Sequence, residues 1–229
     1  AVNPRLFFDT LREVDALSVA FPEVAALVGV PAGPADIHRE GDAFEHTMQV
    51  LTELHSRRPN DVAALLGGLA HDLGKGTTGR DVLPSHHGHA KRGGEIGTAM
   101  RRRLGLPRAV AGAMSVAART HMELHRVTEL DAETLLNIAK QIEGSPLTVN
   151  QLTDIVVADA TARTPQKAID EAVVCHRLSE ATAVIEDVGG TAALSNRGIS
   201  PAEVGESVPG PRVSDFIRQD RAEALRSRL

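Results

Sequence analysis

The 229-residue sequence has no tryptophan, no tyrosine and a single cysteine, Cys175. One cysteine excludes a disulfide framework and is typical of a reducing compartment. Four of the five phenylalanines lie in the first 44 residues, so the rest of the chain lacks the aromatic side chains on which single-stranded nucleic acid stacks. No apolar run reaches the ~18–20 residues of a membrane-spanning helix, and no basic-then-apolar leader opens the chain. We therefore expect a cytoplasmic protein that does not contact a membrane.

The composition is that of a globular protein, with 42% hydrophobic and 24% charged residues. The formal net charge of −5 argues against a polybasic nucleic-acid binder, although it leaves room for a local basic face. A chain of this length forms one large domain, or one domain with a small appendage, and buries a core without disulfides.

Hydrophobic residues recur at helical spacing along nearly the whole chain. Phe44, Met48, Leu51 and Leu54, for example, lie on one face of a helix. There is no alternating strand pattern and no fixed-period repeat, so the sequence predicts an all-α fold. Residues 74–88, rich in Gly, Thr, Pro and His, are expected to form a loop. The predicted helices cover residues 3–18, 43–57, 62–73, 89–104, about 107–121, 132–142, 149–163, 166–188 and a basic stretch at the C-terminus.

Nine of the ten histidines lie between residues 38 and 125. Imidazole is the commonest metal ligand in proteins, and carboxylates join it on ions such as Zn, Mn, Fe, Ni and Mg. A single histidine is more often solvated or hydrogen-bonded in an ordinary structural role, and we interpret His38, His55 and His176 in that way. The others need a pattern that ties them to one site.

His71 and Asp72 supply the first such pattern, at the C-terminal end of an otherwise apolar helix. Neighbours on a helix are ~100° apart, so the pair can hold one ion beside the last turn. An aspartate at this end opposes the helix dipole, which makes a purely structural role mildly unfavourable, and a bound cation reverses that sign.

Asp159 supplies the second pattern, because it continues the apolar face formed by Leu152, Ile155 and Val156. A buried carboxylate without a partner is very costly, so a cationic group must face it. Arg163, one turn further, is the simpler candidate, and a metal ion is the more specific one. His46 flanks the apolar face of its own helix, a position compatible with pointing inward.

The order His, then His-Asp, then Asp on separate helices resembles the HD superfamily of metal-dependent phosphohydrolases. The surrounding sequence resembles, more specifically, the C-terminal HD region of bacterial multifunctional CCA proteins, from the N-terminal NPRLFFDTLREVDAL to the tail RAEAL. The segments that carry this resemblance are HDLGKG from residue 71, HHGH from 86, RLGLP from 103, THMELH from 120 and DATART from 159.

The resemblance implies an HD-domain helical bundle with helical extensions at both ends. We divide the chain into an N-terminal helical segment (1–42), an HD phosphohydrolase core (43–165) and a C-terminal helical segment (166–229). The nucleotidyltransferase head of those proteins, with its Gly-Gly and Asp-x-Asp motifs, has no counterpart in this sequence. We therefore expect the chain not to add CCA by itself, and to be either a fragment of a CCA protein or a stand-alone relative of its HD part.

The resemblance also implies a divalent metal ion, Ni, Co, Mn or Mg, that activates a water molecule for attack on phosphorus. In two-metal relatives the aspartate of the HD pair bridges the ions. His89 and His121 are the candidate ligands of a second ion here. The implied ligands of the first ion are His46, His71, Asp72 and Asp159.

Further residues are expected to act on the substrate. His71, Asp72 and Lys75 are the predicted catalytic residues, with the Lys75 ammonium neutralising a phosphoryl oxygen. His86, His87 and Arg163 are the predicted phosphate-binding residues, although Arg163 has the alternative role of pairing with Asp159.

The activity that this resemblance implies is hydrolysis of phosphate esters on nucleotides or RNA ends. It would comprise 2′,3′-cyclic phosphodiesterase, 2′-nucleotidase and phosphatase reactions, with tRNA as a candidate partner. One alternative is a tRNA-binding module whose HD site is vestigial. Another is an HD 5′-nucleotidase or cyclic-nucleotide phosphodiesterase. The sequence makes no prediction of the oligomeric state.

Overall fold

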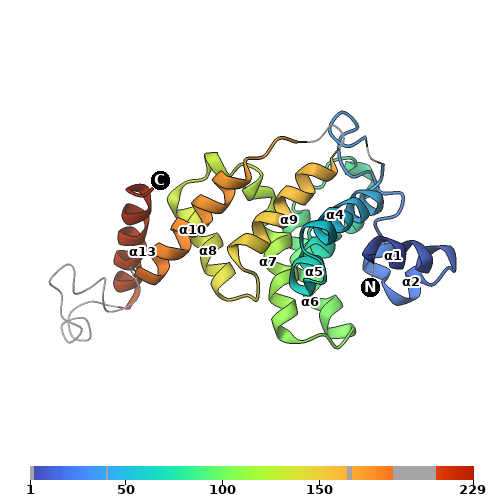
Figure 1. Cartoon of the computed structure of the whole chain (residues 1–229), viewed down its shortest axis with the longest axis horizontal. Helices are drawn as coiled ribbons and strands as arrows, with labels where there is room; N and C mark the ends of the chain where they lie inside the picture. Colours follow the sequence, from blue (N-terminus) through green and yellow to red (C-terminus); the bar gives the residue numbers. More distant parts are fainter. Residues whose placement is uncertain (1–2, 40, 164–166, 188–209) are drawn as a thin grey trace. The chain divides into compact units, whose positions relative to one another are not determined.

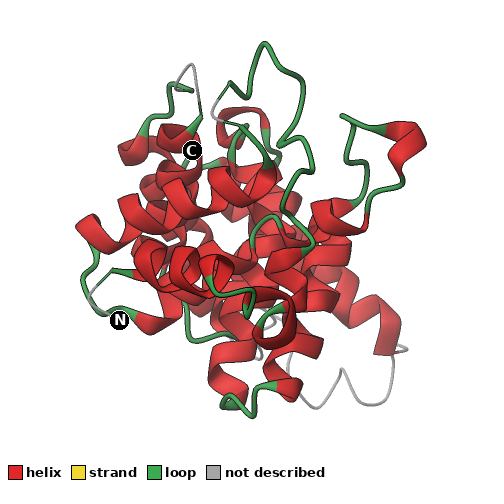
Figure 2. Cartoon of the chain, turned by 90° about the vertical axis from the view of Figure 1, so that its right-hand side faces the viewer, coloured by secondary structure: helices red, strands yellow, loops and turns green. Residues whose placement is uncertain are grey.

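The computed structural model describes residues 3–39, 41–163, 167–187 and 210–229. These residues form helices and loops, as Figure 2 shows. Pro31 and Asp42 form one isolated β-bridge among them. The predicted all-α class is confirmed. The predicted limits at residues 165, 166 and 188 lie outside the described residues.

The chain divides into two compact units (Figure 1). Unit 1 comprises the described residues of Ala1–Arg126 and Gly144–Glu171, and unit 2 those of Val127–Glu143 and Ala172–Leu229. The main elements of unit 2 are η3 (Val127–Glu129), α8 (Ala132–Glu143), α10 (Glu171–Asp187) and α13 (Gly210–Arg226). Those of unit 1 are α1 (Pro4–Glu13), α2 (Leu17–Ala20), α3 (Pro22–Ala25), α4 (Ala43–Arg57), α5 (Val62–Ala70), η1 (Leu73–Thr77), η2 (Arg80–Val82), α6 (His89–Arg103), α7 (Arg108–Leu124) and α9 (Val149–Ala162).

Side-chain caps begin two helices at the residues where the predicted helices start. Asp61 accepts a hydrogen bond from the Ala64 backbone N–H at 3.1 Å and starts α5. Thr148 and Gln151 form a reciprocal capping box at the start of α9. Side-chain caps satisfy backbone donors that the first helical turn leaves unpaired. These starts are local features, which is why they could be predicted from the sequence.

Some helix limits differ from the predictions. The helix predicted over residues 62–73 ends at Ala70, and the 3-10 helix η1 follows it. The segment 74–88, predicted as a loop, contains most of η1 and all of η2. The helix predicted over residues 3–18 is interrupted after Glu13, where Asp15 adopts a left-handed backbone conformation with φ 55°. Left-handed geometry cannot continue an α-helix of L-residues, so α1 ends there.

The N-terminal segment shares the hydrophobic core of unit 1 with the helices that follow it. Phe8, Leu17 and Leu27 are buried in one cluster with Phe44 and Met48 of α4. The Arg5 guanidinium on α1 also forms a bidentate ion pair with Glu45 on α4, at 2.7 and 2.9 Å. Two parallel N–H···O bonds of this kind hold the two helices in a defined orientation. The division of the chain at residue 42 stays a prediction, and in the structure this segment shares one core with α4.

Glycine at position 74 allows η1 to approach the first turn of α6. A Cβ atom there would overlap the His89 carbonyl and lie 2.7 Å from the Gly93 backbone nitrogen. Both obstacles are backbone atoms, which cannot rotate away as a side chain can. The distance between η1 and α6 therefore depends on the missing side chain at this position.

We predict that Gly74→Ala lowers the free energy of unfolding by about 1–3 kcal/mol, the typical cost of forcing extra atoms into a packed interior. Urea unfolding followed by circular dichroism measures the loss. Gly94→Ala, on α6, is the matched control: its Cβ would meet the side chain of Arg119, which is exposed, and alanine favours the helix. Equal stability of the two variants would contradict this account of Gly74.

Candidate metal centre

Helix ends in unit 1 bring histidine and aspartate side chains together in the protein interior. His46 lies in the first turn of α4, His89 is the first residue of α6, and His71 caps the C-terminus of α5. His121 and Asp159 occupy the last turns of α7 and α9. The six side chains that converge, all buried, are His46, His71, Asp72, His89, His121 and Asp159.

Backbone carbonyl groups set the tautomers of three of these histidines. In each case the ring Nδ1 lies within hydrogen-bond distance of the carbonyl oxygen three residues earlier. A carbonyl only accepts, so Nδ1 carries the proton and Nε2 carries the lone pair that a metal ion binds. The three bonds run from His71 to Gly68 (2.6 Å), from His89 to His86 (2.8 Å) and from His121 to Ala118 (2.9 Å).

Several acceptor atoms in the centre lack a hydrogen-bond donor, or face another acceptor. Among the described residues, His71 Nε2 and Asp72 Oδ1 find no hydrogen-bond partner, although both atoms are buried. His89 Nε2 and His121 Nε2 lie 3.3 Å apart, although both rings already donate from Nδ1. Two neutral acceptor atoms at this distance repel each other, and a buried acceptor without a partner costs free energy. A cation between these atoms removes both penalties.

Asp72 lies between two groups of histidines and presents one carboxylate oxygen to each. Its Oδ2 is 3.1 Å from His71 Nε2 and 3.8 Å from His46 Nε2. Its Oδ1 is 3.3 Å from His89 Nε2 and 3.6 Å from His121 Nε2. A carboxylate in this position has the geometry to bridge two ions.

The potential ligand atoms form two sets of three. Those of His46, His71 and Asp159 lie within 4.8 Å of one another, and so do those of Asp72, His89 and His121. Ligands about 2.0–2.3 Å from one ion are at most about 4.6 Å apart, so both sets have nearly the spacing of a coordination sphere. The structure thus brings together every residue that the sequence indicated as a metal ligand, while the metal-binding role itself stays a prediction.

The charge states of these groups also suit metal binding. Burial raises the pKa of the Asp72 carboxyl, but the nearby Lys75 ammonium holds it well below its usual value. Burial likewise opposes ionisation of Asp159, whose pKa is nevertheless held well below its usual value by His125 and Arg163. Burial lowers the pKa of His121 to about 3. Ionised carboxylates and neutral imidazoles are the forms that coordinate metal ions.

Asp159 is held from its other side by a residue that the sequence analysis did not assign to the site. His125 Nε2 lies within hydrogen-bond distance of Asp159 Oδ2 and of the Arg163 guanidinium, while His46 Nε2 lies 3.0 Å from Asp159 Oδ1. Arg163 lies 3.3 Å from both oxygens, as in the simpler of its two predicted roles. The one signal in the sequence was spacing: His125 follows His121 by four residues, and such residues share a helix face.

Lys75 is buried beside the centre and links it to the N-terminal segment. Its ammonium group lies 2.7 Å from Asp72 Oδ2 and donates to the Ala32 carbonyl at 2.7 Å. These contacts use two of its three N–H groups. The ammonium is thus placed next to the HD pair, as predicted, but it also has a structural role that the sequence did not indicate.

His86 and His87, predicted together as phosphate-binding residues, have different surroundings. His86 is buried, and its two ring nitrogens bond to the Pro31 carbonyl (2.7 Å) and the Thr78 hydroxyl (2.9 Å). Both ring nitrogens are thus engaged in these bonds, which does not support the predicted phosphate-binding role of His86. His87 is exposed and faces the cavity described next.

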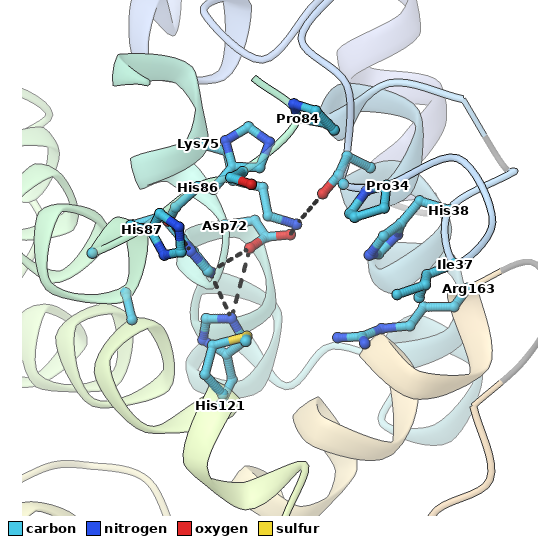
Figure 3. Close-up of a pocket in the computed structure, with 17 residues that line it drawn as sticks. Pro34, Ile37, His38, Asp72, Lys75, Pro84, His86, His87, His121 and Arg163 are labelled. Carbon is cyan, nitrogen blue, oxygen red and sulfur yellow. Dashed lines mark hydrogen bonds and ion pairs between the residues drawn. The ribbon is translucent and has the colours of Figure 1, made fainter. Parts of the chain in front are cut away.

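A cavity of about 470 Å³ opens onto the centre. Figure 3 shows Asp72 and His121 at its floor, with the Arg163 guanidinium pointing into it from the end of α9. Lys75 and His87 also line it. The volume falls within the ~300–1,000 Å³ typical of small-molecule sites. The cavity combines an acidic and imidazole-rich floor with cationic side chains around it, an arrangement suited to a metal ion that faces an anionic substrate.

The described part of the chain is thus a helical protein with a buried centre of histidines and aspartates. A model of the HD domain family matches residues 43–164, more than half of the chain. The chain therefore belongs to the HD domain family, a superfamily of metal-dependent hydrolases. HD domains bind divalent metals, and the two sets of ligand atoms described above are suited to that role.

Similar curated proteins carry the name Multifunctional CCA protein. The one from Pasteurella multocida (strain Pm70) is 37% identical over 174 residues, which is 73% of this chain and 41% of that protein. The one from Thioalkalivibrio sulfidiphilus (strain HL-EbGR7) is 42% identical over 142 residues, 62% of this chain and 34% of that protein. The chain thus spans well under half the length of these relatives. The predicted resemblance to their HD region is confirmed.

None of the described helices combines the length and the apolar character that crossing a membrane requires.

Proposed function

We propose that the chain is a metal-dependent hydrolase of phosphate esters on nucleotides or RNA ends. The observation that carries the proposal is the pair of Nε2 atoms of His89 and His121, 3.3 Å apart with both Nδ1 protons committed elsewhere. Such an arrangement is unfavourable without a cation. Asp72, which faces both histidine groups, extends the same argument to a second ion.

The residues that would hold the ions are those already grouped by distance. His46, His71 and Asp159 would hold one, His89 and His121 the other, and Asp72 would bridge them. Divalent ions at such a site supply acidity to water and neutralise phosphate charge. The donor set has four imidazoles and two carboxylates, which favours Mn, Co or Ni over Mg, because imidazole suits transition metals and Mg prefers oxygen ligands.

The chain's own residues would bind and orient the phosphate. The third N–H of Lys75, the guanidinium of Arg163 and the ring of His87 all reach the cavity and can meet phosphoryl oxygens. Cationic donors placed in advance around a phosphoryl group stabilise the charge of the transition state. His86 would instead hold the loop before α6 in place through its bonds to Pro31 and Thr78.

The preference for the 2′ position rests on the resemblance to multifunctional CCA proteins and not on a contact in the cavity. We propose 2′,3′-cyclic phosphodiesterase, 2′-nucleotidase and phosphatase activities, with tRNA ends among the substrates. The alternative of a vestigial site is less well supported, because all six candidate ligands are in place.

The first test concerns the HD pair. We predict that His71→Ala and Asp72→Ala each lower the metal content of the purified protein and reduce kcat for phosphate esters at least 100-fold, since each removes a ligand of the proposed centre. Elemental analysis and phosphate release measure the two effects. His176→Ala, an exposed substitution on α10, is the control. Wild-type turnover by either HD variant would exclude this pair as the catalytic metal site.

The second test concerns the substrate. With Mg, Mn, Co and Ni in turn, we expect release of phosphate from 2′-AMP and ring opening of 2′,3′-cAMP to exceed hydrolysis of 3′- and 5′-AMP. Matched nucleotides share base and sugar, so the comparison isolates the position of the phosphate. Strong 5′-nucleotidase activity without turnover of the 2′ and cyclic substrates would favour the alternative of an HD 5′-nucleotidase.

The third test concerns His125, which would position Asp159 without binding metal. We predict that His125→Ala weakens Co²⁺ binding about 10–100-fold, the usual effect of removing a hydrogen-bond partner of a metal ligand. Titration of chelator-treated protein, followed by visible absorption, measures this without turnover. His125→Gln keeps an N–H donor and should restore part of the affinity. Unchanged affinity in His125→Ala would show that Asp159 needs no such support.

A further inference from the structure

Residues 31–38, which we call the strap, are fixed against the proposed metal centre. The carbonyls of Pro31 and Ala32 accept hydrogen bonds from His86 Nε2 and Lys75 Nζ, both at 2.7 Å. Lys75 also holds Asp72, so one side chain connects the strap to the centre. Both donors are buried. The strap is therefore positioned by the same groups that surround the site.

The strap forms one wall of the cavity above the centre. Ala32, Gly33, Pro34 and Ile37 line that wall, and Figure 3 shows Pro34, Ile37 and His38 together on one side of the cavity. Met122, on α7, lines the cavity as well. Ile37 and Met122 are each 44% exposed, so apolar surface remains open to solvent beside the polar floor of the cavity.

We infer that the strap and Met122 form the subsite for the nucleoside part of the substrate, an inference that rests on the proposed function. The cavity of about 470 Å³ is larger than a phosphate group needs, and its remaining lining is mainly apolar. A ribonucleoside is uncharged and has an apolar base face, whereas a second phosphate would find no lysine or arginine on the strap wall. The subsite thus selects nucleoside monophosphate groups over polyphosphates.

Because of the position of the strap, different parts of the chain would contact the phosphate and the nucleoside. The HD match covers residues 43–164, so the wall formed by residues 32–37 lies before it. The HD part supplies the metal ligands and phosphate contacts, and the segment before it contacts the leaving group. Because the wall carries one imidazole, His38, and offers no set of polar groups to read a base edge, adenine and cytosine nucleotides should bind about equally.

Ile37→Ser tests the subsite. We expect KM for 2′-AMP, and for a short RNA that ends in a 2′,3′-cyclic phosphate, to rise about fivefold to tenfold through lost apolar contact. The inhibition constant of inorganic phosphate, which reaches only the centre, should not change. Ile37→Leu should retain the wild-type KM. Val28→Ser is the matched control, since Val28 is 37% exposed and does not line the cavity.

Two outcomes would overturn the inference. If the phosphate inhibition constant rises in parallel with KM, Ile37 supports the centre and not the nucleoside. If only the RNA substrate is affected, the nucleoside of the free nucleotide lies elsewhere. Calorimetric binding of 2′-AMP to Mn²⁺-loaded protein repeats the comparison without turnover. If Ile37→Ser binds 2′-AMP more weakly in this measurement, the subsite is supported whether or not the protein hydrolyses any ester. Absence of hydrolysis would refute only the proposed function.

Discussion

The buried carboxylate of Asp72 is the group on which the rest of the site depends. An ionised carboxylate in the protein interior is stable only when positive charge or hydrogen-bond donors surround it. The Lys75 ammonium, 2.7 Å away, supplies one such charge. The imidazoles around the carboxylate supply none, because three of them direct lone pairs toward it. The side chains around the carboxylate therefore supply too little positive charge, and bound divalent cations would supply the rest.

Backbone geometry at helix ends prepares the histidines before any ligand arrives. His71, His89 and His121 each donate Nδ1–H to a carbonyl three residues earlier, which fixes both tautomer and ring orientation. No second side chain is needed for this. The close approach of η1 to α6 at Gly74 then brings the end of α5 next to His89. Local hydrogen bonds thus aim the ligands, and helix packing sets their separation.

The N-terminal segment belongs physically to the same unit as the centre. Its Phe8 and Phe21 pack in the core shared with α4, and its strap accepts hydrogen bonds from Lys75 and His86. A change in this segment would reach the cavity without touching a metal ligand. In this architecture, substrate preference can vary while the metal ligands stay the same.

The sequence by itself determined the helical class, the capped starts of α5 and α9, and the six residues with ligand chemistry, because periodicity, caps and motifs are local in the chain. It also indicated the family through motifs at known spacing. It did not determine the role of His125, the separate fates of His86 and His87, or the contact of Ala32 with Lys75. These depend on pairs 34 to 55 residues apart, such as His125 with Asp159 and Pro31 with His86. Only the packing of the helices brings such pairs together, because local sequence patterns do not specify which distant carbonyl a side chain will contact.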